Sequence, residues 1–132
     1  MRESVNQVSD VVVCGHSQCG AMAALLGGVA QATALPHLAE WLEIARPVRE
    51  LLARDYQHLN EPVARAIAAA AENVLFALEN LRSYPCVQQR LARGGLHLHG
   101  WFFKIASAEL FAYDPETHQF APLIRDEPRE SP

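Results

Sequence analysis

The chain has 132 residues, half of them hydrophobic and a fifth charged, with a formal net charge of -4 at pH 7. This length allows one globular domain with its own core. The negative charge and the absence of a Lys/Arg cluster exclude a nucleic-acid partner, and no apolar run approaches the roughly 18 residues that cross a bilayer. Three cysteines, an odd number, argue against a disulfide framework. We therefore expect a cytoplasmic protein without membrane or nucleic-acid partners.

The first half of the chain predicts a strand followed by helices. The apolar run from Asp10 to Cys14 predicts a short strand covered on both faces of a parallel sheet. A helix is expected to follow over residues 21–26 and to stop at Gly27-Gly28. Pro36 suits the first turn of a second helix, whereas Pro47 predicts a kink or a break in it.

The second half predicts one long helix and then strands. The clearest amphipathic pattern starts at Asn60, a candidate N-cap, has Pro62 just inside its start, and ends at Pro85. The elements expected after it are a short helix over 87–92, two hairpin strands over 96–105 and 109–113, and a brief return over 120–123. These elements predict a single α/β domain over residues 1–124 and a disordered, charged tail over 125–132.

A candidate metal site follows the first predicted strand, where His16 and Cys19 stand three residues apart at the start of a helix. An imidazole nitrogen and a thiolate are zinc-type ligands, and open α/β sheets bind their ligands at the carboxyl ends of strands. Gly15 and Gly20 let the backbone approach closely, and Ser17 lies in the same turn. By itself the pair is equally well interpreted as a structural turn, because catalytic zinc uses three protein ligands.

The wider segment 12–22, Val-Val-Cys-Gly-His-Ser-Gln-Cys-Gly-Ala-Met, closely resembles the zinc-ligand segment of the β-class carbonic anhydrases. A second match lies downstream and is similar to the C-terminal half of that family. It comprises Glu72-Asn73-Val74, the segment Asn80 to Pro85, and the segment Leu96 to Trp101. The resemblance runs from about Val5 to Leu123 and is greatest to the bacterial and cyanobacterial branch, which ends in a His-Gly-Trp strand and a hairpin.

The resemblance implies a twisted, mainly parallel sheet flanked by helices, in a homo-oligomer that binds Zn²⁺. It also implies reversible hydration of carbon dioxide to bicarbonate, because zinc generates a hydroxide nucleophile at neutral pH. Carried over to this sequence, it makes His16 and Cys19 the second and third protein ligands of the zinc. Gly15, Ser17 and Gly20 then belong to the turn around them.

One departure from the family pattern is large. The family's first zinc ligand belongs to an upstream C-x-D-S-R motif, whose Asp and Arg stand beside the zinc-bound water, and this sequence contains no such motif. The family's N-terminal helices and the first strand of its sheet are also missing. We therefore expect an N-terminally truncated β-carbonic-anhydrase-like fold whose catalytic residues cannot be named, and an impaired or inactive chain as printed.

No other residue replaces the missing ligand well. Cys14 could project to the same side as His16, but it is expected to act as a small hydrophobe, and Cys86 to pack. His97 and His99 share one face of a strand and are expected to pack or hydrogen-bond away from the zinc. The other candidates are expected to be solvent-facing (His37, His58, His118), unrelated to the site (Asp55, Asp114), or core and subunit contacts (Trp41, Trp101-Phe102-Phe103).

Two alternative functions stay open at this stage. The chain could be a non-catalytic fold remnant that acts as an assembly or binding module. It could also be a hydrolase of carbon disulfide or carbonyl sulfide on the same scaffold, because the zinc motif does not select between these substrates and carbon dioxide.

Overall fold

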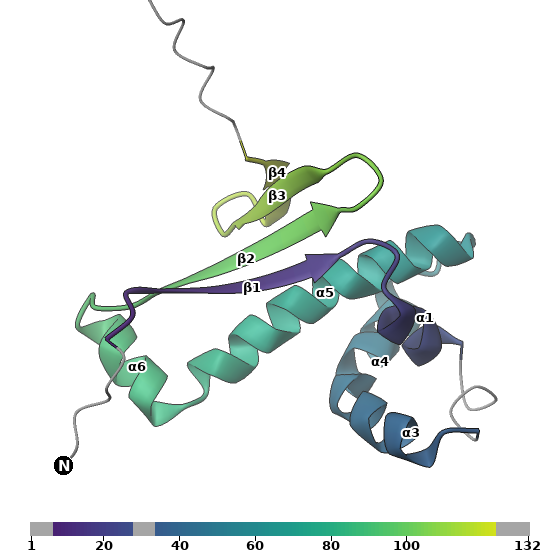
Figure 1. Ribbon diagram of the computed structural model, residues 1–132, viewed down its shortest axis with the longest axis horizontal. Coiled ribbons are helices and arrows are strands. Elements are labelled where there is room, and N and C mark those ends of the chain that lie inside the picture. The colour runs from purple at the N-terminus through teal and green to yellow at the C-terminus, as the bar shows by residue number, and fades with distance from the viewer. Residues whose placement is uncertain (1–6, 28–33, 124–132) are drawn as a thin grey trace, which may run out of the picture.

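A four-stranded sheet and a long helix beneath it organise the computed structural model, which describes residues 7–27 and 34–123 (Figure 1). The strands stand in the order β1-β2-β3-β4. β1 and β2 run parallel along the longest pairing, and β3 and β4 continue the sheet in antiparallel fashion. Their bounds are Asp10–His16 for β1, His97–Lys104 for β2, Glu109–Asp114 for β3 and Gln119–Pro122 for β4. The predicted α/β class and the C-terminal hairpin are confirmed.

The helices follow the predicted pattern with two corrections. The N-cap of α5 is Glu61 rather than Asn60, because the helix begins directly at Pro62. Pro47 does break the second helical segment, because α3 gives way to a 3₁₀ turn, η1, and then to α4, in which Pro47 takes an early position. Pro85 does not end α5, which stops at Arg82; it opens α6, since proline is tolerated in the first turn of a helix. The bounds are Gly20–Leu26 (α1), Pro36–Leu42 (α3), Glu43–Ala45 (η1), Arg46–Asp55 (α4), Pro62–Arg82 (α5) and Pro85–Ala92 (α6).

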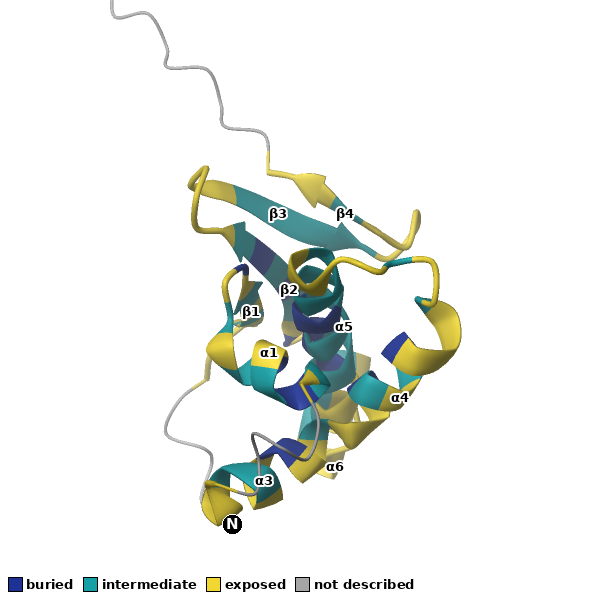
Figure 2. Ribbon diagram, turned by 90° about the vertical axis from the view of Figure 1, so that its right-hand side faces the viewer, coloured by how far each residue is buried: buried dark blue, intermediate teal, exposed yellow. Residues whose placement is uncertain are grey.

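The main buried cluster lies where α5 packs against α1, α3 and α4 and against Phe102 of β2, and the ribbon of α5 is partly coloured as buried (Figure 2). Val74 and Leu78 are buried on the sheet side of α5, where glycines let the helix come close. A Cβ built on Gly15 would lie 2.7 Å from Val74 Cγ2, and one built on Gly100 would lie 3.0 Å from Leu78 Cδ1. These two glycines therefore set the distance between helix and sheet.

β1 differs from its predicted environment. The sequence predicted burial on both faces, but exposure alternates along the strand: Val11, Val13 and Gly15 are half-buried, whereas Val12 and Cys14 are exposed. The first set faces α5, and among residues 7–27 and 34–123 no helix covers the opposite face of β1. β1 is also one of the two edge strands of the described sheet.

Polar contacts join the first half of α5 to the end of α4 and the segment that follows it. Tyr56 Oη donates to Glu72 Oε1 at 2.6 Å, and partial burial together with the Glu72 carboxylate raises the pKa of Tyr56 to about 12. Arg65 Nη1 donates to the carbonyls of Tyr56 and Leu59 at 2.8 and 2.9 Å.

In the part of the chain that the structure describes, none of the helices combines the length and apolar character that a membrane span requires.

Candidate metal site at the end of the first strand

The two predicted ligands stand on either side of a tight turn. His16 is the last residue of β1, Ser17 and Gln18 form the turn, and Cys19 is the N-cap residue of α1. Gln18 has a φ of 54°, in the left-handed region, and reverses the chain there. Both candidate ligands thus lie at the carboxyl end of a parallel strand, as the sequence predicted.

Ser17 ties this turn to the end of β2. It is the one buried polar residue in the described part of the chain, with 8% of its surface exposed. Its backbone N–H donates to the carbonyl of Phe103 at 2.9 Å, and its hydroxyl oxygen accepts the backbone N–H of Ile105 at 2.8 Å. The turn is therefore anchored to β2 and to the segment after it through both the backbone and the side chain of Ser17.

His16 is oriented by a hydrogen bond from one ring nitrogen. Its Nδ1 lies 2.7 Å from the backbone carbonyl of Ser17, which can only accept. In the neutral ring Nδ1 must then carry the proton, and the lone pair is on Nε2. An imidazole held in this way has one nitrogen available as a metal ligand.

The metal donors that the described residues bring together amount to half a zinc site. Within residues 7–27 and 34–123 no group of three or more His, Cys, Asp or Glu side chains could hold a metal ion. The free cysteines of this part of the chain are Cys14, Cys19 and Cys86, and Cys19 is the one that is partly buried. Imidazole and thiolate suit zinc chemically, but a complete site needs a further protein ligand from elsewhere.

The other predicted residues lie away from this turn or point to solvent. His99 Nε2 donates to Asp10 Oδ1 at 2.8 Å at the other end of β1, which confirms the predicted hydrogen-bonding role. This contact, with a second from Ser9, lowers the pKa of the Asp10 carboxyl. His37, His58 and His118 are exposed, as predicted.

Two predictions about packing are wrong. Cys14 and Cys86 are exposed rather than buried, Cys14 because its face of β1 is uncovered among the described residues and Cys86 because it lies in the first turn of α6. Trp41, expected in the core or at a subunit contact, is 62% exposed; it does not belong to the core of this chain, and the subunit contact stays a prediction. Its position on α3 places it at the rim of a small apolar pocket instead.

Among the cavities that the described residues line, one touches a candidate ligand. A cavity of about 620 Å³ lies beside Cys19, between the Ser17–Gly20 turn, the first two turns of α5 and the connection from β2 to β3. Its walls are mostly apolar, and Lys104 is its one ionisable side chain besides Cys19. Sequence reasoning missed these walls, because residues such as Val63 and Ile67 carry no signal beyond that of an amphipathic helix.

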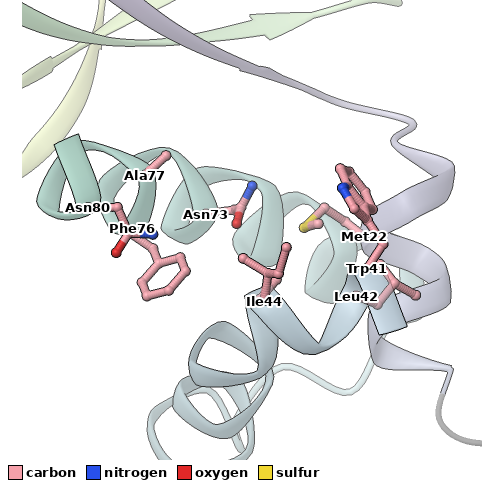
Figure 3. A pocket seen from close by; sticks show the side chains of 9 residues that line it. Met22, Trp41, Leu42, Ile44, Asn73, Phe76, Ala77 and Asn80 are labelled. Atoms are coloured by element: carbon pink, nitrogen blue, oxygen red, sulfur yellow. The ribbon is translucent and has the colours of Figure 1, made fainter. Parts of the chain in front are cut away.

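A second pocket, of about 210 Å³, lies between α5 and the segment of α3 and η1 (Figure 3). Trp41 and Ile44 stand on one side of it, and Asn73, Phe76 and Asn80 project from α5 on the other. No histidine, cysteine or carboxylate lines it, so it offers no metal or acid–base chemistry.

Comparison with known proteins decides the family. The family model described as carbonic anhydrase matches residues 4–110. The chain belongs to the carbonic anhydrase family. It is 42% identical to the carbonic anhydrase of Synechocystis sp. over 120 residues, which are 90% of this chain and 43% of that protein. It is 41% identical to the Pseudomonas aeruginosa carbonic anhydrase, with 88% of this chain and 51% of the relative covered.

Solved structures place the chain in the β class of that family. The β-carbonic anhydrase CcaA superposes with a TM-score of 0.85 at 39% identity, covering 89% of this chain and 56% of that one. The tetrameric β-carbonic anhydrases of Sordaria macrospora give a TM-score of 0.65 at 29% identity, covering 80% and 52%. The predicted resemblance and fold are thereby confirmed. The chain spans about half the length of the curated relatives that it matches.

Proposed function

We propose that this chain supplies half of the zinc site of a β-carbonic anhydrase, which interconverts carbon dioxide and bicarbonate. The observation that carries the proposal is the turn after β1, where Cys19 and a His16 ring with Nε2 available meet at one strand end. When bound, zinc supplies the Lewis acid that generates a nucleophile from water at neutral pH. The part of this chain is to hold two ligands and to provide the cavity beside Cys19.

We also propose that the 132 residues by themselves are impaired as an enzyme. Two protein ligands are present at the turn, and the described residues provide no group of three. Each lost ligand weakens a tetrahedral site, and the carboxylate that the family resemblance implies beside the metal is missing as well. Activity then requires a third ligand from outside the described residues.

A fusion protein tests both statements. The portion of the Synechocystis carbonic anhydrase that precedes the matched region is placed ahead of Met1, and we call this protein the fusion. The fusion is expected to bind about one zinc per chain and to hydrate carbon dioxide, whereas the chain alone does neither. The matched control is the same fusion with the cysteine of the C-x-D-S-R motif, which the family resemblance implies in the added portion, changed to serine, and it should lose zinc.

The other outcomes separate the alternatives. Tight zinc binding and rapid hydration by the chain alone would overturn the proposed impairment. A zinc-loaded fusion that hydrolyses carbon disulfide or carbonyl sulfide but does not hydrate carbon dioxide would replace the substrate. Failure of a folded fusion to bind zinc would favour a non-catalytic assembly module.

The proposed setting is a cytoplasmic homo-oligomer. It is supported by the free thiols of Cys14, Cys19 and Cys86, and by similarity to β-carbonic anhydrases that are described as tetrameric. Light scattering on the same fusion measures its mass, and a monomer would contradict the proposed oligomer.

A further inference from the structure

Ser17 is a buried residue that is hydrogen-bonded through both its backbone and its side chain. Its N–H, its hydroxyl oxygen and its carbonyl oxygen all have partners: Phe103, Ile105 and the His16 ring. Two of these contacts reach across to the end of β2, and the third returns to a candidate zinc ligand. Ser17 is thus a link between the sheet and the orientation of one imidazole.

The geometry indicates that Ser17 orients the His16 ring. The contacts with Phe103 and Ile105 hold both the backbone nitrogen and the side chain of Ser17, and so hold the carbonyl carbon bonded to the same α-carbon in place beside the His16 ring. The oxygen of this carbonyl accepts from His16 Nδ1 at 2.7 Å. Since a carbonyl cannot donate, a fixed carbonyl at this place favours one of the two neutral tautomers of the ring.

We infer that Ser17 is a positioning residue, which holds His16 in the Nδ1–H tautomer with Nε2 free to ligate a metal. The use of Nε2 as a ligand rests on the proposed function, whereas the tautomer itself does not. The role is distinct from zinc ligation, because the hydroxyl of Ser17 is engaged with Ile105 and acts through the backbone.

The test uses the metal-free chain and the substitutions S17A and S17T. Long-range proton–nitrogen correlation spectra distinguish the tautomers of each imidazole. In the wild type the His16 ring is expected to be mainly Nδ1–H, in contrast to free histidine in water, which favours Nε2–H. S17A removes the acceptor of the Ile105 N–H and should shift His16 toward Nε2–H. S17T retains the hydroxyl at a residue that lines the adjoining cavity, so it should retain the wild-type spectrum.

The matched control is S83A, because the Ser83 hydroxyl also makes a backbone contact, to Asn80, but at the far end of α5. It should leave the His16 signals unchanged. Thermal unfolding of all four proteins establishes that each sample is folded. A wild-type ring that is mainly Nε2–H, or a folded S17A with an unchanged His16 tautomer, would overturn the inference.

A second measurement connects the tautomer to metal binding. In the fusion, S17A is expected to lower zinc affinity by about 10- to 100-fold, the usual cost of losing an outer hydrogen-bond partner, while S17T stays within about 3-fold of wild type. If the fusion binds no zinc while S17A still shifts the tautomer, the proposed function fails and the positioning of the ring stands. If zinc affinity in S17A is unchanged, the positioning role is refuted even with an active enzyme.

Discussion

The amino end of β1 is held by exposed polar contacts, whereas its carboxyl end is held by buried packing and a buried serine. At the amino end Asp10 pairs with His99, and Arg90 donates to a backbone carbonyl, all at least partly exposed to water. At the carboxyl end Gly15 lies against α5 and Ser17 is buried. Exposed pairs contribute little to stability, whereas buried contacts are costly to remove, so the site lies at the end of the strand that is fixed more firmly.

The largest expected difference between the two ends of β1 is in zinc affinity, when a histidine is removed from one end or the other. In the fusion, H16A is expected to weaken zinc binding by more than about 100-fold, beyond the effect of losing an outer partner, because it deletes a ligand. H99A is the matched substitution at the other end and should leave zinc affinity unchanged, because the contact of His99 is with Asp10. Isothermal titration with zinc measures both. Equal losses from the two substitutions would contradict the placement of the site.

Addition of a methyl group to Gly15 tests the packing of the carboxyl end. A Cβ there would lie 2.7 Å from Val74 Cγ2 and 3.1 Å from the carbonyl oxygen of Ala70. G15A is therefore expected to lower the free energy of unfolding by about 1–3 kcal/mol, measured by urea denaturation, since overpacking forces α5 away from the sheet.

The control for that substitution lies five residues further on. Gly20 has no atom within 4 Å of a built Cβ, and it begins α1. G20A should change the free energy of unfolding by no more than about 0.5 kcal/mol, as surface substitutions usually do. If G15A is as stable as G20A, the close approach of α5 to β1 is not what fixes this end of the strand.

The smallest effect is expected at the amino end, as a change in pH dependence. The pKa of Asp10 is lowered chiefly by its hydrogen bond from His99, so the folded state favours the ionised carboxylate. This contribution to stability is present above the ordinary carboxyl pKa near 4 and is lost as pH falls through the lowered value. In D10N the stability should therefore fall less steeply than in the wild type between about pH 5 and pH 2. Thermal unfolding at several pH values across that range measures this. A steeper acid slope in D10N would mean that the pair does not stabilise the fold.

Sequence patterns predicted the elements that carry local signals. The stripe along α5, the break at Pro47 and the strand–turn–helix that holds His16 and Cys19 all follow from residues close together in the chain. The exposure of Val12 and Cys14 was mispredicted, because a run of apolar residues does not reveal whether a second layer covers the strand.

The contacts of Ser17 were beyond the reach of sequence reasoning. Its partners, Phe103 and Ile105, lie in a different strand and the turn after it, and no periodicity encodes the register between β1 and β2. The Gly15–Val74 contact could not be predicted either, because a glycine beside a turn does not indicate which helix packs against it. The two candidate ligands can therefore be recognised from a sequence motif, whereas the contacts that hold them in place are visible only in the folded structure.

The Ser17–Ile105 hydrogen bond joins residues 88 positions apart, and this has a consequence for how the protein folds. The residues of the turn are therefore synthesised well before the residues that anchor them. Closing so long a segment carries a loop-entropy cost, and folding that depends on such distant pairings is slow. The orientation of His16 is therefore acquired late, and a chain interrupted before β2 would carry the motif without the ordered ligand.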